Sequence, residues 1–133
     1  MIRALAHICF VVTDLDVSLA FYADALGLKP AFDFTDEKGR RFGVYLRIGG
    51  RSFLELFEGV PAPPRDDCSF RHICLEVEDM ESAVEALRDR GIEVTEPVLG
   101  SDASYQAWLN DPDGNRIELH AYTEESRQRQ FLP

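Results

Sequence analysis

The sequence lacks a paired-cysteine pattern, a run of basic residues and a long apolar segment. Its three cysteines, Cys9, Cys68 and Cys74, are odd in number and show no CxxC spacing, which argues against a disulfide framework and favours a reducing compartment. No stretch is long enough to cross a bilayer, so we expect no membrane partner. The 24 acidic and 14 basic residues give a formal net charge of −10. Such a surface repels phosphate backbones, so we expect no nucleic-acid partner.

The sequence also lacks the motifs of several enzyme and export classes. Its glycine pairs form no phosphate loop, and it contains no nucleophile elbow. The first residues, MIRALAHICFVV, resemble a signal peptide superficially. Their apolar run is short, however, and leads into Thr13 and Asp14 instead of a small-residue cleavage site, so we expect a cytoplasmic protein. With 45% hydrophobic residues the chain can build a core, as one compact unit or as two small halves sharing one core.

What the sequence does contain is an internal repeat. Residues 7–28 (HICFVVTDLDVSLAFYADALGL) match residues 72–92 (HICLEVEDMESAVEALRDRGI), beginning with the same tripeptide His-Ile-Cys. The apolar and β-branched starts, HICFVV and HICLEV, are typical of buried strands. A shared tripeptide alone could arise by chance. Because the same order of strand, acidic residue, helix and glycine follows it in both copies, we interpret the match as two copies of one module.

Local signals mark the ends of a helix in each copy. Asp14 and Asp79 stand where a helix N-cap accepts hydrogen bonds from the first free backbone amides. Gly27 and Gly91 stand where the left-handed backbone conformation ends a helix. Three strands are predicted after each helix, with turns at Lys38-Gly39, Gly49-Gly50 and Asp111–Asn115 between them. Their ranges are 29–35, 41–48 and 52–58 in the first copy, and 92–98, 104–110 and 115–121 in the second.

The sequence therefore predicts an α+β fold of two βαβββ modules. The proline-rich, polar segment GVPAPPRDD favours a short linker between the copies. The predicted organisation is a first module at residues 1–58, a linker at 59–69, a second module at 70–122 and a polar C-terminal tail at 123–133.

Candidate metal ligands repeat with the module. His7 opens the first strand of one copy and Glu55 lies in its last strand; His72 and Glu118 hold the same places in the other copy. Two imidazoles and two carboxylates suit a divalent zinc, nickel, cobalt, manganese or iron ion and leave coordination positions open. Taken singly, each residue has a plainer interpretation, since a histidine in an apolar strand is more often a hydrogen-bonded core residue. The repetition of the pair on equivalent strands favours the metal site.

Other residues near the predicted ligands leave alternatives open. Glu118 shares a strand face with Arg116 and His120, so a surface salt bridge is an alternative to metal binding. His120 is either a third histidine near the metal or part of a solvent-facing strand end. Cys9 and Cys74 lie two residues after the histidines on the same strand faces, either as small apolar pocket groups or as soft ligands. Tyr105 and Trp108 lie on opposite strand faces, so at most one of them lines the pocket.

These motifs resemble the vicinal oxygen chelate superfamily, which includes glyoxalase I, bleomycin-resistance proteins, methylmalonyl-CoA epimerase and extradiol dioxygenases. The resemblance extends to about residue 122 and rests on the H…FY…LG start, FLELF, the second histidine and the NDPDGNRIEL ending. It implies a glyoxalase-like fold, in which paired modules form a curved, cup-shaped mixed β-sheet around a divalent metal. It also implies a homodimer in which modules from two chains complete each site.

The order His7, Glu55, His72 and Glu118 resembles the ligand pattern of glyoxalase I most closely. Epimerases of the superfamily commonly have glutamine at the position of Glu55, and its dioxygenases use two histidines and one carboxylate. The resemblance therefore implies a metal-dependent lyase or isomerase that moves a proton through a metal-stabilised enediolate of a small vicinal-oxygen substrate. It makes Glu118 the leading catalytic base and Glu55 the second candidate.

The residues that hold glutathione in bacterial glyoxalase I do not carry over. The resemblance places an arginine and an asparagine at positions that are Val11 and Gly59 here, so it gives no basis for glutathione dependence. Arg47, Arg51 or Arg71 could bind an anionic group elsewhere, although surface arginines usually have no specific role. An extradiol-type dioxygenase is one alternative function. A non-catalytic binding protein for a drug or metabolite is another, and the full set of four ligands counts against it.

Overall fold

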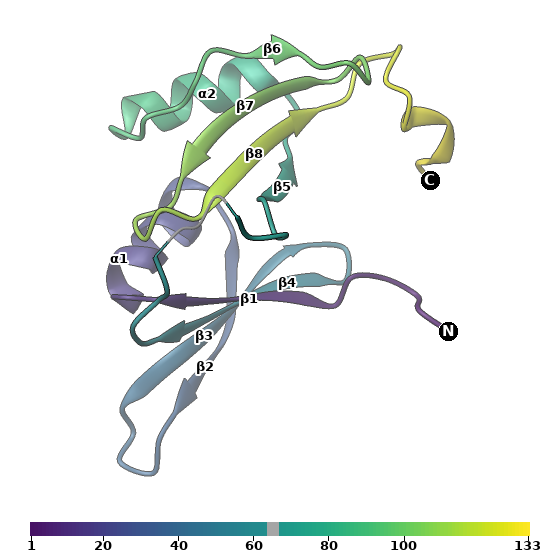
Figure 1. Cartoon of the computed structure of the whole chain (residues 1–133). Coiled ribbons are helices and arrows are strands. Elements are labelled where there is room, and N and C mark those ends of the chain that lie inside the picture. The colour runs from purple at the N-terminus through teal and green to yellow at the C-terminus, as the bar shows by residue number, and fades with distance from the viewer. Residues whose placement is uncertain (64–66) are drawn as a thin grey trace. The chain divides into compact units, whose positions relative to one another are not determined.

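The computed structural model describes residues 1–63 and 67–133 and divides the chain into two compact units, Met1–Pro63 and Pro64–Pro133. The boundary between the units falls within the segment 59–69 that the sequence suggests as a linker. Part of that segment, residues 64–66, lies outside the described residues. Each unit has a four-stranded mixed sheet of its own (Figure 1).

The first unit has the predicted order of one strand, one helical segment and three strands. Its sheet has the order β1-β4-β3-β2, in which β1 is parallel to β4 and the other neighbours are antiparallel. The helix α1 continues directly into the π-helix η1. The elements are β1 (His7–Val12), α1 (Leu15–Leu19), η1 (Ala20–Ala25), β2 (Lys29–Thr35), β3 (Arg41–Gly49) and β4 (Ser52–Glu58).

The second unit repeats this order, with the sheet order β5-β8-β7-β6 and a parallel β5–β8 pair. Its elements are β5 (Ile73–Glu76), α2 (Met80–Asp89), β6 (Val98–Leu99), β7 (Tyr105–Asn110) and β8 (Arg116–Ala121), followed by the 3-10 helix η2 (Arg129–Phe131). The predicted α+β fold of two βαβββ modules is confirmed. In the described part of the chain, no helix has the length and apolar character needed to cross a membrane.

The predicted strand at 92–98 is wrong, because β6 is confined to Val98 and Leu99. Pro97 has no backbone N–H to donate just before this short strand. Thr95 does bond to β7, with its N–H 3.0 Å from the carbonyl oxygen of Trp108. In return, however, the Trp108 N–H donates to the Thr95 hydroxyl at 2.9 Å instead of to a backbone carbonyl. The side chain of Thr95 thus replaces the backbone acceptor that a regular ladder requires.

The predicted helix ends are confirmed in both units. The Asp14 carboxylate accepts hydrogen bonds from the N–H groups of Asp16 and Val17 at 2.9 and 3.0 Å. Asp79 accepts one from the N–H of Ser82 at 2.8 Å. Gly27 and Gly91 both have φ of +78°, the left-handed region in which glycine ends a helix without steric cost.

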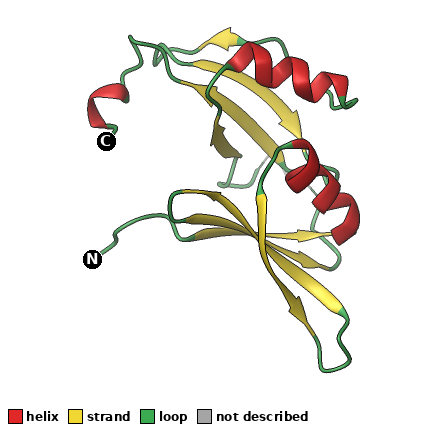
Figure 2. Cartoon of the chain, turned by 180° about the vertical axis from the view of Figure 1, so that it is seen from behind, coloured by secondary structure: helices red, strands yellow, loops and turns green. Residues whose placement is uncertain are grey.

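One face of each sheet is buried on the helix side, and strand alternation puts the candidate carboxylates on the other face. In β4, Leu54 and Leu56 are buried, and Glu55 between them points to the opposite face. In β8, Ile117 and Leu119 flank Glu118 in the same way. Figure 2 shows α2 along one side of β7 and β8. The helix-side core is completed by Leu15, Tyr22, Val44 and Leu46 in the first unit and by Met80, Val84, Leu87, Ala107 and Leu109 in the second.

Gly43 in β3 lies directly opposite Phe57 of β4, and the Phe57 ring occupies the space above it. A Cβ atom on Gly43 would lie 2.4 Å from Phe57 Cδ1 and 2.9 Å from the Leu56 carbonyl oxygen. We expect Gly43→Ala to lower the free energy of unfolding by about 1–3 kcal/mol, the usual cost of overpacking. Urea unfolding measures this. Gly49→Ala is the control, because a Cβ there meets nothing within 4 Å, and an equal loss in both variants would contradict the packing account.

Candidate metal centre

In the first unit, the parallel pairing of β1 and β4 brings a histidine beside a glutamate. His7 lies opposite Phe53 and Cys9 lies opposite Glu55. The Nε2 atom of His7 is 3.7 Å from Oε2 of Glu55. The Glu55 side chain is only 15% exposed, and within the described residues it forms no ion pair with a lysine or arginine. A largely buried carboxylate without a cationic side chain is suited to binding a metal ion.

The second unit repeats this arrangement more tightly. Cys74 lies opposite Glu118 in the parallel β5–β8 pair, and His72 immediately precedes β5 instead of opening it as predicted. The Nε2 atom of His72 is 3.0 Å from Oε2 of Glu118, whose side chain is 12% exposed. The structure thus brings together His7 with Glu55 and His72 with Glu118. The two pairs belong to different units, and their role as ligands is still a prediction.

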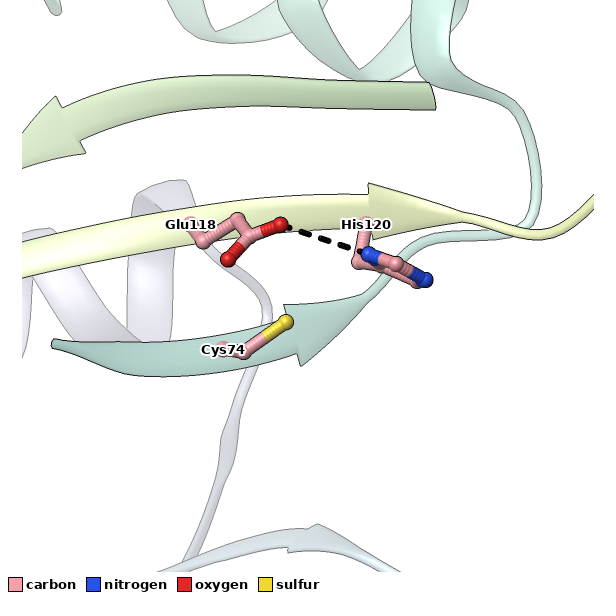
Figure 3. Close-up of side chains that lie close together, drawn as sticks. All are labelled: Cys74, Glu118 and His120. Atoms are coloured by element: carbon pink, nitrogen blue, oxygen red, sulfur yellow. Dashed lines mark hydrogen bonds and ion pairs between the residues drawn. The ribbon is translucent and has the colours of Figure 1, made fainter. Parts of the chain in front are cut away.

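His120 lies beside Glu118 and is not part of a solvent-facing strand end (Figure 3). Its Nδ1 is 3.3 Å from Glu118 Oε1, its Nε2 is 3.9 Å from Asp102 Oδ2, and its side chain is 12% exposed. Of the two partners that the sequence offered Glu118 for a salt bridge, His120 lies within ion-pair distance and Arg116 does not. The Arg116 guanidinium lies 4.1 Å above the ring of Trp108 instead, a cation–π contact.

Each carboxylate also has a thiol as a neighbour. Burial, the charge of Glu118 and a hydrogen bond to Glu118 together raise the pKa of Cys74 to about 12. Burial, a hydrogen bond to Glu55 and the charge of Glu55 raise the pKa of Cys9 in the same direction. Both residues nevertheless retain contact with solvent. In the metal-free protein each thiol therefore stays protonated at neutral pH and donates to its carboxylate.

The second unit offers a cation two sets of ligands. One is the pair His72 and Glu118. The other is Cys74, Glu118 and His120, whose ligand atoms lie within 4.8 Å of one another and form the one such group of three in the described residues. This second set has no counterpart in the first unit, because Phe57 occupies the position in β4 that His120 occupies in β8. Of these two ligand sets, only the His–Glu pair has a counterpart in the first unit.

An aromatic ring supports the histidine in each unit. Tyr45 lies opposite Glu55 and makes an edge contact with the His7 ring at 5.7 Å between centroids. Trp108 lies opposite Glu118 and makes an edge contact with His72 at 4.9 Å. The aromatic residue of β7 on the site face is therefore Trp108. Tyr105 lies in a groove on the opposite face with α2 residues such as Val84, in agreement with the expectation that at most one of the two lines the site.

Two features of the site face were missed at the level of sequence. The first is Asp102, which approaches His120 from the loop between β6 and β7, where no motif marks it. The second is a surface of rings that continues from Glu55 across the first sheet. These rings lie on one face because of the strand register, which the sequence reveals only in part. We call it the aromatic surface: Phe32, Phe34, Tyr45, Phe53 and Phe57.

The chain matches known proteins over nearly its whole length. Residues 4–119 match the model of the Glyoxalase/Bleomycin resistance protein/Dioxygenase superfamily. A probable lactoylglutathione lyase of Synechocystis sp. is 34% identical over 125 residues, which cover 86% of this chain and 92% of the relative. The crystal structure of SMU.1112c superimposes with a TM-score of 0.79 at 29% identity, covering 90% of this chain and 99% of that one. TnmS3, an antibiotic-binding protein from Streptomyces sp. CB03234, superimposes with a TM-score of 0.74 at 26% identity, covering 92% and 98%.

The raised pKa of Cys74 predicts slow alkylation of this residue in the metal-free protein. With a pKa of about 12, about one thiol in ten thousand is ionised at pH 8. Cys68 and Cys74 are both exposed, so we expect Cys74 to react with iodoacetamide more slowly than Cys68 because of the Glu118 carboxylate beside it. Glu118→Gln should speed the reaction of Cys74, because it removes the negative charge that opposes ionisation. Mass spectrometry of timed samples measures both rates, and equal rates for the two wild-type cysteines would contradict the assigned environment.

Proposed function

The chain belongs to the Glyoxalase/Bleomycin resistance protein/Dioxygenase superfamily, and from this premise we propose that it is a divalent-metal-dependent lyase or isomerase. The observation that carries the proposal is the pair of histidine and glutamate that recurs at equivalent positions of the two units. The substrate is a small molecule with two adjacent oxygens. The similarity to a probable lactoylglutathione lyase supports this class of reaction.

The ligands in this proposal are His7, Glu55, His72 and Glu118. Their donor atoms are two imidazole nitrogens and two carboxylate oxygens, which fit zinc, nickel, cobalt, manganese or iron. Such a cation supplies Lewis-acid chemistry, since it polarises a substrate carbonyl and makes the adjacent C–H bond more acidic. A metal also offsets the burial of two carboxylates that lack lysine or arginine partners in the described residues.

Glu118 is the proposed base, because its surroundings hold it in one orientation. As an ionised carboxylate it only accepts hydrogen bonds, so His120 donates from Nδ1 to Oε1. The other oxygen, Oε2, lies 3.0 Å from Nε2 of His72 and is the proposed acceptor of the substrate proton. The corresponding neighbour of Glu55 is the apolar side chain of Phe57, which holds neither oxygen. Glu118 takes the proton from one carbon and returns it to the next one.

A non-catalytic binding protein is the second candidate function. The supporting observation is the aromatic surface, in which Phe32 is 52% exposed and stacks on Tyr45 with 4.9 Å between ring centroids. Exposed flat rings bind a planar apolar ligand without any chemistry. TnmS3, a structural relative, is an antibiotic-binding protein. Turnover separates the two candidates, because the binding protein would retain its ligand unchanged.

Metal content tests the ligand set. We expect near-stoichiometric zinc, nickel, cobalt, manganese or iron by elemental analysis of the purified protein, or after refilling it with added metal. His7→Ala and His72→Ala should each lose most of the metal, whereas Cys68→Ser, a change at an exposed residue, should keep it. A wild-type protein that holds no metal and cannot be refilled would refute the enzyme proposal and favour the binding protein.

Exchange of substrate hydrogen with solvent tests the base. In D₂O, proton NMR over a panel of small hydroxyketones, hydroxy acids and hemithioacetals should detect deuterium entering next to a carbonyl. Glu118→Gln should slow this exchange by about 10²–10⁴-fold, the usual contribution of a general base. Full exchange by a Glu118→Gln protein that still holds its metal would show that another residue is the base.

His120 tests the orientation of the base separately. His120→Phe, which copies Phe57 of the first unit, should lower metal affinity or exchange by about 10–100-fold, as the loss of an outer hydrogen-bond partner usually does. His120→Asn places a donor near the position of Nδ1 and should restore most of the loss. Equal defects in both variants would indicate that His120 has only a packing role.

A further inference from the structure

One row of side chains crosses the whole first sheet and ends at His7. In the strand register, Lys29 of β2 lies opposite Arg47 of β3, Arg47 opposite Phe53 of β4, and Phe53 opposite His7 of β1. Residues directly opposite one another in a sheet project from the same face. Lys29 and Arg47 therefore share the face that carries the first half of the candidate metal site.

A β-bulge at Ala31 extends this face. The register of β2 against β3 shifts between Pro30 and Phe32, so that Phe32 lies opposite Tyr45. Without the shift, strict alternation would turn Phe32 to the helix side, because it is three residues from Lys29. The bulge therefore places Lys29 and the aromatic ring of Phe32 on the same face.

Lys29 and Arg47, the two cationic residues of the row, line a pocket that contains a third cationic residue. Arg51, in the turn between β3 and β4, lines it together with Lys29 and Arg47, and we call it the cationic pocket. Among the described residues no carboxylate lines the pocket, and its other lining residues are Pro30, Ala31, Gly50 and Phe53. Like charges directly opposite one another, as in Lys29 and Arg47, destabilise a sheet. None of the three forms an ion pair with a described residue, although the chain has an excess of acidic groups.

The repeat of the fold does not account for this pocket. The position of Arg47 in β3 corresponds to Asn110 in β7, since Arg47 pairs with Phe53 and Asn110 with Arg116 in the equivalent strands. The position of Lys29 corresponds to the part of residues 92–98 that forms no strand. The cations are therefore particular to the first unit, where they lie on the same face as the aromatic surface.

We propose that the cationic pocket binds an oxyanion, a carboxylate or a phosphate-type group, at the end of the substrate remote from the metal. This inference rests on the proposed function for the identity of the other end. Neighbouring strands lie about 4.8 Å apart, so Arg47 is about 10 Å and Lys29 about 14 Å from the position of His7 along the row. Phe53 and Tyr45, whose ring centroids are 5.3 Å apart, cover the space between. The substrate class is an anionic molecule with an apolar, flat middle and two vicinal oxygens at its far end.

Phenylphosphonate is the probe, because it combines an aromatic ring with an oxyanion, and benzamide is its neutral analogue. Amide shifts of ¹⁵N-labelled, metal-stripped protein should change around Lys29, Arg47 and Arg51 in a saturable manner. Arg47→Gln should weaken the binding of phenylphosphonate about tenfold or more, the value of a lost charge-assisted hydrogen bond. Benzamide should bind the wild-type protein no more tightly than phenylphosphonate binds Arg47→Gln. Arg40→Gln is the matched control. It removes the same charge from the same unit, at a residue already paired with Asp36, and should change the affinity less than twofold.

The outcomes separate this inference from the proposed function. Saturable binding that Arg47→Gln weakens and Arg40→Gln does not supports the cationic pocket, whether or not metal is ever found. The absence of saturable binding, or an equal loss in Arg47→Gln and Arg40→Gln, overturns the cationic pocket and leaves the metal proposal standing.

Discussion

The candidate site depends on the parallel pairing of the first and last strands in each unit. In such a pair, side chains opposite one another share a face. Glu55 lies opposite Cys9, and His7 shares the face of Cys9, so the register places Glu55 beside His7. A slip of the register by one residue would turn Glu55 toward the helix side, into the place that Leu54 or Leu56 now occupies. A carboxylate is too costly to bury there without a partner. Burial of the leucines therefore also sets the register that keeps Glu55 on the opposite face.

The two units carry the same pair of residues but surround it differently. Glu55 lies among rings, and the cations of its sheet lie two and three strands away from His7. Glu118 instead has His120 on one oxygen and His72 on the other, with Asp102 behind His120. The duplicated pair thus suits metal binding, while the unduplicated residues suit separate tasks: recognition of the substrate in the first unit and proton transfer in the second. This division is what gives the two glutamates different proposed roles.

The sequence revealed the fold through local signals that occur twice. The caps at Asp14 and Asp79 and the glycines that end both helices are short-range features, and each is confirmed. The strand at 92–98 could not be predicted correctly, because its apolar residues favour a strand while Pro97 and the hydroxyl of Thr95 interrupt the ladder in the folded chain. The irregularity there depends on a partner in β7 that local sequence does not identify.

The same limit applies to the site. The proximity of each histidine to its glutamate follows from the repeat and from strand alternation, both visible in the sequence. The row from Lys29 to His7 does not, because it requires the pairing of four strands and a bulge at Ala31 that no motif announces. Asp102 was missed for a similar reason, since it reaches His120 from a loop. Contacts that depend on long-range register are therefore the part of the site that only the structure supplies.

The environment of the bound metal tests the central claim most directly. X-ray absorption of the protein loaded with a single metal such as zinc reports the type and distance of each ligand. The quartet of His7, Glu55, His72 and Glu118 predicts a shell of nitrogen and oxygen at about 2.0–2.2 Å, with the outer scattering of two imidazoles and no sulfur. A sulfur ligand at about 2.3 Å would contradict the quartet, which contains no thiol, and would favour a thiol-containing set such as Cys74, Glu118 and His120 in the second unit.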